Sequence, residues 1–262
     1  MKQANDFLEE TKTLHKLISG LNENEFDKTT LFKEWTINDI LVHLHFWNRA
    51  ADLSLNKPDE FAEMIKEFFS AVQTGKLRPH ENRVIAERGY ALMDAWLDLS
   101  DKLANDYSRA DPKQRLQWAG ANMSALTCIS ARQMEVWAHG QAVFDLLGED
   151  RKEHDRIRNI VILGINAFGW THEVHSLEKP EVMPFLKLLA PSGEEWSFGE
   201  ESKTQCIKGS AVDFAKVVTQ TRNVVDTHLV ITGKDAQQWM AHAQCFAGPP
   251  EMPPAPGLRK KS

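Results

Sequence analysis

The sequence predicts an α+β protein in which a long helical region is followed by a small mixed domain and a short tail. From residue 3 to about residue 170, apolar residues recur at steps of three and four with few turn signals, which is typical of helices. Beyond Trp170, prolines and glycines separate short apolar runs typical of strands. The final segment, GPPEMPPAPGLRKKS, is rich in proline. We therefore expect a helical domain at 1–168, an α+β domain at 175–247 and a flexible tail at 248–262.

The helical region divides at recognisable start and stop signals. Thr36 is expected to cap the second helix, because Asp39 follows three residues later in a capping-box pattern. The segment KPDE ends this helix, and Gly148 is placed to cap the fifth. The helices are therefore expected over residues 5–21, from Thr36 to KPDE, over part of 59–75, and over 80–107, 122–147 and 153–167.

The region after residue 175 predicts the order strand, strand, strand, helix, strand, helix, which is a small α+β module. Turn residues bound each of its short apolar runs. The expected strands are FLKLLA, EEWSFG, TQCIKG and THLVIT, and the expected helices cover 211–223 and 236–246.

Composition and charge exclude several classes of protein. A net charge of −6 leaves no broad basic surface for nucleic acid or an anionic membrane. No apolar run is long enough to span a bilayer, and charged residues interrupt the place where a signal peptide would be apolar. The 3 cysteines show no paired spacing, which favours a reducing compartment. We therefore predict a cytoplasmic protein that binds neither nucleic acid nor membrane. Its oligomeric state stays open and is compatible with a homodimer.

Two ionisable residues lie on the apolar face of the helix expected at 122–147. An unpaired carboxylate at Glu135 would cost several kcal/mol or would take up a proton. Side chains at i and i+4, such as Glu135 and His139, stand about 6 Å apart and can reach one metal ion. The pair therefore predicts a metal site, with a solvated or mutually bonded pair as the alternative. The other residues of this stripe are Cys128, Ala131, Ala138, Ala142 and Leu146.

His43 is the best candidate for a third ligand. It borders the apolar stripe of the helix that follows Thr36, whereas His45 projects to another side. Two nitrogens and one carboxylate oxygen make a typical catalytic zinc site with a position open for water or substrate. Nickel, iron or manganese would also suit this ligand set. Asp39, one turn before His43, is expected to accept a hydrogen bond from its imidazole.

Other motifs give weaker indications. HEVH at 172–175 is not HExxH, and we expect it in a loop or linker rather than at a second metal site. Trp35 and Trp47 are interpreted as core residues, as aromatic side chains at helical spacing usually are. Arg83 and Arg88 are interpreted as parts of an exposed helix face. The sequence has no GxSxG, GxGxxG or P-loop motif to indicate a serine hydrolase or a nucleotide-binding protein.

One pair of segments carries a resemblance to a known family. WTINDILVHL, followed about ninety residues later by ExxxH, resembles the metal-binding helical bundle of the DinB-like superfamily. It resembles more closely the N-terminal domain of the mycothiol-dependent maleylpyruvate isomerases. GINAFGW and the segment from GSAVDF to FAGPP are similar to a branch of uncharacterised metal-binding proteins. The resemblance covers residues 5–250.

This resemblance implies a left-handed DinB-like four-helix bundle followed by a sterol-carrier-like α+β domain. It implies that His43, Glu135 and His139 hold a divalent metal, taken to be zinc, with nickel or iron as alternatives. Thiol cofactor and substrate would meet at this metal, in a cleft between the two domains. A basic residue of the C-terminal domain would help to hold an anionic substrate, and we assign Arg222 to this role.

The function expected from these indications is that of a metal-dependent enzyme. It would isomerise or conjugate a small anionic electrophile with the help of a low-molecular-weight thiol. Cys128 is not expected to be that thiol, because it lies about 10 Å along the helix axis from Glu135 and is typical of a small buried hydrophobe. Two alternatives stay open: a metal-dependent hydrolase, and a ligand-binding protein whose structural metal has Asp39 or His45 as a fourth ligand.

Overall fold

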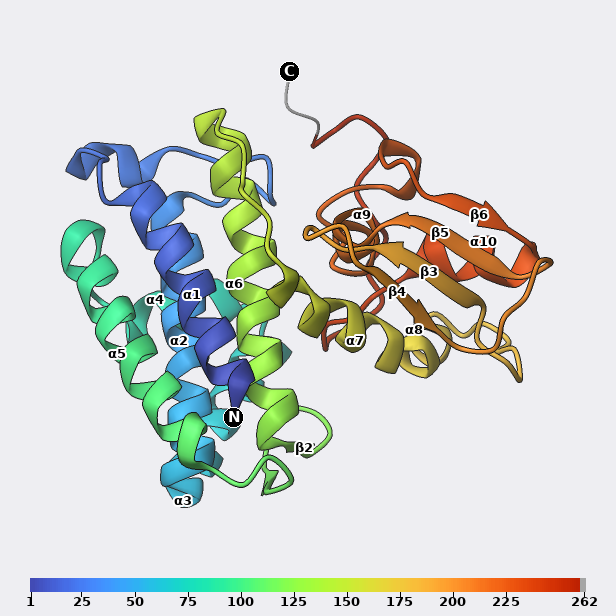
Figure 1. Cartoon of the computed structure of the whole chain (residues 1–262). Helices are drawn as coiled ribbons and strands as arrows, with labels where there is room; N and C mark the ends of the chain where they lie inside the picture. Colours follow the sequence, from blue (N-terminus) through green and yellow to red (C-terminus); the bar gives the residue numbers. More distant parts are fainter. Residues whose placement is uncertain (260–262) are drawn as a thin grey trace. The chain divides into compact units, whose positions relative to one another are not determined.

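The chain folds into two compact units, formed by Met1–Leu146 and by Leu147–Ser262. The computed structural model describes residues 1–259 (Figure 1). Helices make up most of the first unit, and the second combines helices with a small sheet. This arrangement confirms the predicted α+β class.

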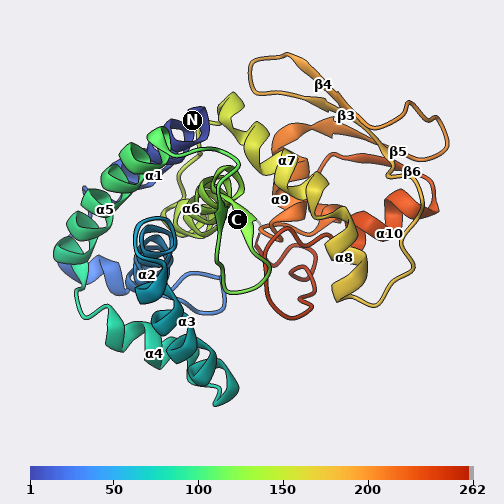
Figure 2. The same cartoon turned by 90° about the horizontal axis from the view of Figure 1, so that it is seen from below.

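The N-terminal unit is a bundle of long helices with a core of aromatic and aliphatic side chains. α1 packs on α5, which in turn packs on α2, and Figure 2 shows α2 and α6 nearly end-on. Each fully buried side chain such as Phe7, Trp96 or Trp137 contributes roughly 1.5–3 kcal/mol to stability. The four long helices are α1 (Lys2–Ile18), α2 (Ile37–Asn56), α5 (Gly89–Arg109) and α6 (Ala125–Leu147).

Shorter elements connect the long helices. The two-stranded antiparallel sheet before α6 was not predicted, because two-residue strands carry no periodic signal. α4 packs against both α2 and α3. These connecting elements are a 3₁₀ turn (Glu23–Asp27), α3 (Pro58–Gln73), α4 (Leu77–Val84), β1 (Arg115–Leu116) and β2 (Met123–Ser124).

The predicted caps of α2 and α6 are confirmed. The Thr36 hydroxyl accepts a hydrogen bond from the backbone N–H of Asp39 at 3.0 Å, and the Asp39 carboxylate accepts one from the backbone N–H of Thr36 at 3.0 Å. This reciprocal pair satisfies two backbone donors at the start of α2. Gly148 adopts a φ of +71°, as the residue after a helix end commonly does.

The single helix predicted over 80–107 is wrong, because the chain breaks between α4 and α5. Gly89 has a φ of +55°, and its N–H donates to the Asn38 side-chain oxygen at 2.9 Å. A Cβ atom at this position would lie 1.8 Å from Oε1 of Glu23. The break is therefore fixed by contacts with residues distant in the sequence, which helical periodicity does not report.

The C-terminal unit contains a four-stranded sheet in the order β4-β3-β5-β6. β3 pairs antiparallel with β4 and parallel with β5, and β5 pairs antiparallel with β6. Figure 1 shows this sheet with α9 and α10 beside it. The predicted strands and helices are confirmed in type and order: β3 (Phe185–Leu189), β4 (Glu195–Phe198), β5 (Cys206–Ser210), α9 (Ala211–Val218), β6 (Val230–Thr232) and α10 (Lys234–His242).

Two helices before the sheet belong to the C-terminal unit, so the division after Leu146 falls earlier than the expected boundary at 168–175. α7 (Arg158–Asn166) packs on α9, where Gly164 lies so close to Val218 that a Cβ atom would approach it to 2.8 Å. α8 (Phe168–Val174) contains most of HEVH. The expectation of a loop there is therefore wrong.

α9 ends earlier than the helix predicted over 211–223. Gln220 adopts a φ of +54°. The backbone N–H of Thr221 donates to the Lys216 carbonyl at 3.0 Å, and that of Gln220 donates to the Val217 carbonyl at 3.0 Å. This is a Schellman motif, here with a glutamine in place of the usual glycine, which explains why the sequence did not reveal the stop.

The proline-rich tail is anchored over its described part rather than free. Gln220 donates from its side-chain amide to the Glu251 carbonyl at 2.7 Å, and Asn223 donates to the Pro254 carbonyl at 2.9 Å. The Arg259 guanidinium donates to the Gln220 carbonyl at 2.8 Å. These bonds differ from the predicted flexible tail at 248–262, of which residues 260–262 lie outside the described residues.

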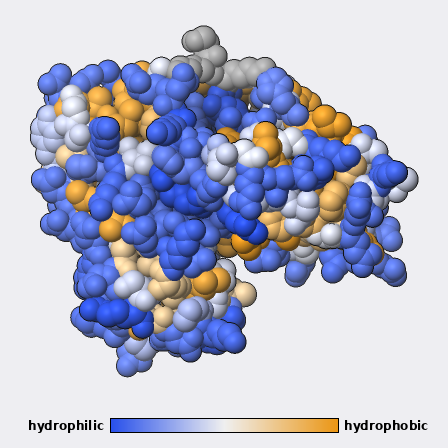
Figure 3. Space-filling view, in the orientation of Figure 1, coloured by the Kyte–Doolittle hydropathy of each residue, from blue (hydrophilic) through white to orange (hydrophobic). Residues whose placement is uncertain are grey.

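The surface shown in Figure 3 is mostly hydrophilic, with small apolar patches. Within residues 1–259, no helix is both long enough and apolar enough to cross a membrane.

Candidate metal centre

α6 places Glu135 and His139 on one face, one turn apart. Their side chains meet: Nε2 of His139 lies 3.0 Å from Oε2 of Glu135. Only 19% of the Glu135 side chain and 11% of the His139 side chain are exposed. The inward-facing pair predicted from the apolar stripe is therefore present in the structure.

α2 brings His43 to the same point. Its Nε2 atom lies 3.6 Å from Oε2 of Glu135, and the rings of His43 and His139 are 4.8 Å apart. The three side chains each offer one ligand atom, and these atoms lie within 4.8 Å of one another. Within residues 1–259, this is the single cluster of three or more His, Cys, Asp or Glu side chains that could hold a metal ion.

The three donors fit a divalent metal. In a tetrahedral site with bonds of 2.0–2.1 Å, neighbouring ligand atoms stand about 3.3 Å apart. The observed nitrogen-to-oxygen distances, 3.0 Å for His139 and 3.6 Å for His43, lie on either side of that value. Because the three side chains supply only three ligand atoms, a four-coordinate metal would keep one position for a ligand from solution.

Glu81, which the sequence analysis did not single out, supports His43 from α4. Nδ1–H of His43 donates to Oε1 of Glu81 at 3.0 Å, and Nη1 of Arg78 donates to Oε2 of the same carboxylate at 2.5 Å. Asp39 was expected in this place, but its carboxylate instead accepts from Thr36 and, at 2.5 Å, from Nη2 of Arg78. Asp39 is therefore connected to His43 only through Arg78 and Glu81, because its own side chain caps α2.

Arg132 is a second residue that the sequence did not reveal. It lies one turn before Glu135 on α6 and is 3% exposed, and its Nη2 atom stands 3.6 Å from Oε1 of Glu135. The guanidinium also lies over the ring of Trp118, 5.9 Å from its centroid. Glu135 thus faces the two histidines with one oxygen and a buried cation with the other.

A tight turn presents two aromatic rings to the histidines. Trp35 stacks on His139 with ring centroids 5.6 Å apart and an interplanar angle of 8°, and it also contacts His43. Phe32 meets His139 edge-on at 5.0 Å. Between them, Lys33 and Glu34 both have positive φ angles, of 51° and 56°. Trp35 therefore belongs to the candidate site and not to the core to which the sequence analysis assigned it.

The charge environment favours the ligand form of Glu135 and His139 but not that of His43. Burial alone would raise the pKa of Glu135, but the hydrogen bond with His139, the nearby imidazole of His43 and the charge of Arg132 hold it well below its usual value. Burial lowers the pKa of His139, which favours a neutral ring. Burial opposes protonation of His43 too, but the charges of Glu81 and Glu135 raise its pKa. A metal ion at this place would therefore compete with a proton on His43.

The remaining candidates lie elsewhere. The His45 side chain is buried outside the triad, and burial lowers its pKa to about 4. Arg222 lies just after α9 in the C-terminal unit, where it donates to the Thr221 carbonyl at 2.8 Å. Its assignment to substrate binding stays a prediction. In HEVH, His172 is buried and its Nδ1–H donates to the Phe168 carbonyl at 2.7 Å.

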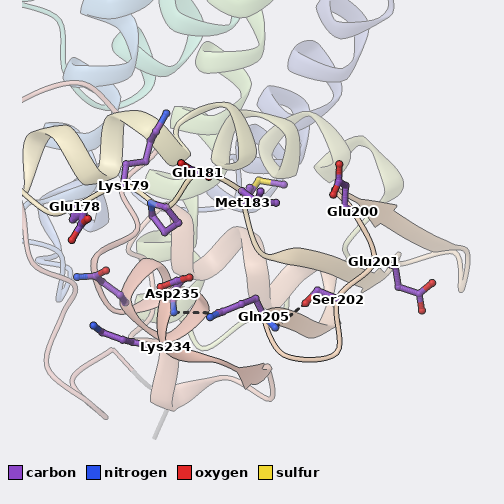
Figure 4. Close-up of a pocket in the computed structure, with 13 residues that line it drawn as sticks. Glu178, Lys179, Glu181, Met183, Glu200, Glu201, Ser202, Gln205, Lys234 and Asp235 are labelled. Carbon is purple, nitrogen blue, oxygen red and sulfur yellow. Dashed lines mark hydrogen bonds between the residues drawn. The ribbon is translucent and has the colours of Figure 1, made fainter.

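A separate surface pocket of about 740 Å³ lies in the C-terminal unit. Its carboxylates do not converge: Figure 4 shows Glu178, Glu181, Glu200 and Glu201 spread around the pocket. It therefore lacks the geometry of the triad. The pocket is lined by Glu178, Lys179, Pro180, Glu181, Val182, Met183, Glu200, Glu201, Ser202, Gln205, Lys234, Asp235 and Gln238.

Comparison with known proteins identifies the family. Residues 7–144 match the model of the mycothiol maleylpyruvate isomerase N-terminal domain, which is more than half of the chain. The chain belongs to this family. Two uncharacterised proteins from two strains of Mycobacterium tuberculosis are each 32% identical to it over 245 residues, 94% of this chain and 95% of theirs.

A solved structure shares the fold. The crystal structure of the mycothiol-dependent maleylpyruvate isomerase superposes with a TM-score of 0.51 at 16% sequence identity, covering 82% of this chain and 87% of that one. Both units of the chain are thus needed to account for the match. The family membership expected from WTINDILVHL and ExxxH is confirmed.

Proposed function

We propose that this protein is a metal-dependent enzyme that isomerises or conjugates a small anionic electrophile with the help of a low-molecular-weight thiol. The observation that carries the proposal is the convergence of His43, Glu135 and His139, two nitrogens and one carboxylate oxygen, in a member of the maleylpyruvate isomerase family. Zinc is the metal that best fits this ligand set, with nickel and iron as alternatives.

Each group of residues in the site would have a separate role. The triad would hold the metal, which when bound supplies a Lewis acid that lowers the pKa of a coordinated thiol. Burial would raise the pKa of Glu135, but the hydrogen bond with His139 and the charge of Arg132 lower this pKa and keep the carboxylate charged. Trp35 packs on both imidazoles and Phe32 packs on that of His139, which fixes the position of the rings.

In the isomerisation, the thiolate would form a carbon–sulfur bond to one carbon of an activated double bond, and the electron pair of that double bond would move to the neighbouring carbonyl. The former carbon–carbon double bond is then a single bond, about which the adduct can rotate. Return of the electron pair from the carbonyl oxygen would expel the thiolate and restore the double bond in the other geometry. The thiol is thus regenerated. In a conjugation, a proton would instead trap the adduct.

The thiol is expected to come from a small molecule. Cys128 is fully buried, and the Tyr107 hydroxyl donates to its sulfur at 3.2 Å. Burial raises the pKa of the Cys128 thiol to about 11, so the reactive thiolate is scarce near neutral pH. Cys128→Ala should therefore keep thiol-dependent turnover within about twofold of the wild type, and native Cys128 should resist alkylation until the protein unfolds.

The first test is metal content. Wild type and three variants, His43→Ala, Glu135→Ala and His139→Ala, would be purified without metal-chelating resin and examined by elemental analysis. We expect close to one metal per chain in wild type and loss in all three variants. The exposed histidine His154 supplies a matched control, because His154→Ala should keep its metal. Absence of metal from wild type offered zinc, nickel and iron would refute the proposal.

The second test separates the proposed reaction from its rivals. The metal-loaded protein would be offered maleylpyruvate and related unsaturated acids with mycothiol, with another small thiol, and with none. Turnover that requires a thiol supports the proposal. Hydrolysis of esters or amides without thiol would indicate a metal hydrolase, and ligand binding without turnover a binding protein. The structure gives the latter little support, since Asp39 and His45, its candidate fourth ligands, lie outside the cluster.

A further inference from the structure

Glu81 is a fully buried carboxylate whose two oxygens have different partners. It is 0% exposed, in a short helix composed mainly of polar residues. One oxygen accepts from Nδ1 of His43 at 3.0 Å, and the other accepts from Nη1 of Arg78 at 2.5 Å. Because both oxygens are engaged, the carboxylate cannot rotate without losing a charged hydrogen bond.

Arg78 is itself fixed on two further sides. Its Nη2 atom donates to the side chain of Asp39 at 2.5 Å and to the backbone carbonyl of Asp39 at 3.2 Å. Its guanidinium carbon lies 4.2 Å from the ring centroid of Trp35. The carboxylate behind His43 is therefore held by α4, by the start of α2 and by the aromatic turn together.

The hydrogen bond to Glu81 determines which nitrogen of His43 can bind a metal. A ring that donates from Nδ1 leaves the lone pair on Nε2 free in its neutral form. Nε2 is the ring nitrogen of His43 that faces Glu135, 3.6 Å from its Oε2 atom. Ligating histidines in metalloproteins commonly donate their other nitrogen to a carboxylate in this way.

We propose that Glu81 is a positioning residue that holds His43 in the form that binds metal through Nε2, so that α4 determines how tightly the site retains its metal. The inference rests on the metal-binding part of the proposed function. It assigns to Glu81 no contact with substrate.

The test compares Glu81→Gln and Glu81→Ala. Glutamine keeps an oxygen that can accept from Nδ1 but removes the charge, whereas alanine removes both. Glu87→Ala, at an exposed glutamate six residues later, is the matched control. The dissociation constant for Zn²⁺ would be measured by competition with a chromogenic chelator, and the melting temperature of each metal-free variant would be recorded alongside.

We expect Glu81→Ala to weaken Zn²⁺ binding about 10–100-fold and Glu81→Gln to weaken it less, by under about tenfold. Glu87→Ala should bind Zn²⁺ as the wild type does. Wild-type affinity in a folded Glu81→Ala protein would overturn the proposal. If Glu81→Ala does not fold, the Glu81→Gln protein decides: unchanged zinc affinity together with an altered His43 tautomer would overturn it.

A measurement without metal keeps this inference separate from the proposed function. Nitrogen-15 NMR of metal-free wild type at alkaline pH reports which ring nitrogen of His43 carries the proton. We expect Nδ1–H in wild type and a mixture of tautomers in Glu81→Ala. Nε2–H as the main form in wild type would overturn the role of Glu81, whereas failure of wild type to bind any metal would overturn the proposed function alone.

Discussion

The two histidines of the triad differ in the residues outside the triad that hold them. His43 is fixed by charge, through Glu81 and the Arg78–Asp39 pair behind it. His139 is fixed by packing, between the stacked ring of Trp35 and the edge of Phe32. A charged hydrogen bond sets the tautomer of a ring, whereas packing sets its position and leaves the tautomer to other partners. One site thus combines a histidine fixed by a carboxylate from outside the triad with a histidine whose hydrogen-bonding carboxylate, Glu135, is itself a candidate ligand.

Glu135, which faces both histidines, should give the largest effect. In the metal-free protein, Glu135→Ala is expected to lower the free energy of unfolding by about 3–5 kcal/mol, because it leaves the buried Arg132 without its facing carboxylate. His139→Ala should cost less, since it removes no counter-charge. Chemical denaturation of the metal-free proteins measures both.

A double variant sharpens this prediction. Replacing the pair together, with Glu135→Leu and Arg132→Met, should recover most of the lost stability, because an apolar pair of similar volume often matches a buried ion pair. A Glu135→Ala protein within about 1 kcal/mol of wild type would mean that Arg132 does not depend on Glu135.

Trp35 contacts both histidines and Arg78, so its removal should cause the second-largest loss of stability. Trp35→Ala is expected to cost about 2 kcal/mol, less than a fully buried tryptophan, because its ring is only half-buried. Phe32→Ala, which removes a partly exposed ring in contact with His139 and Trp35, should cost about 1 kcal/mol.

Additivity tests whether the two sides are independent. Phe32→Ala and Glu81→Gln should add in their effects on stability, whereas Trp35→Ala and Glu81→Gln should not, because Arg78 contacts both Trp35 and Glu81. Equal additivity in the two pairs would break the division of the site into a charged and an aromatic side.

The turn that carries the aromatic side should be improvable. The backbone N–H of Trp35 donates to the Phe32 carbonyl at 2.9 Å, and the positive φ angles of Lys33 and Glu34 make this a type I′ turn. Such turns favour Asn-Gly. Lys33→Asn with Glu34→Gly is expected to stabilise the protein by about 1 kcal/mol, measured by thermal unfolding, and to leave zinc affinity unchanged. A loss of stability would indicate that side-chain contacts of Lys33 or Glu34 outweigh the backbone strain.

The smallest effect is expected at the outer end of the charged side. Burial would raise the pKa of Asp39, but hydrogen bonds from Thr36 and Arg78 lower it below 3.8. Its contribution to stability is therefore present above about pH 4 and is lost as the pH falls through the folded-state pKa. Asp39→Asn should cost about 0.5–1 kcal/mol at neutral pH and progressively less in acid, measured by denaturation across this pH range. A cost independent of pH would assign the effect to the cap alone.

Local signals explain what the sequence could predict. Thr36 and Asp39 are three residues apart, and Glu135 and His139 four apart, so helical geometry alone brings each pair together. His43 could be placed at the site because its helix was identified and because the family resemblance assigned it. The class of the C-terminal unit followed in the same way from short apolar runs between turn residues.

The missed features depend on contacts that no local pattern encodes. Glu81 follows His43 by 38 residues, and the whole of α3 lies between them in the sequence. The turn at Lys33 and Glu34 contains neither glycine nor asparagine, so it carries no turn signal. The sequence pattern around Arg132 does not show whether its side chain lies at the surface or in the core. Only the structure shows that it faces the Glu135 carboxylate.

The stacking of Trp35 on His139 provides an intrinsic fluorescent reporter of metal binding. An indole within 5.6 Å of one candidate ligand and 5.3 Å of another lies well within the range over which a coloured or paramagnetic ion quenches fluorescence. Cobalt or copper titrated into this protein should therefore dim the emission of Trp35, and Trp35→Phe supplies the blank. The occupancy of the centre could then be followed in a cuvette, in real time and without any knowledge of the substrate.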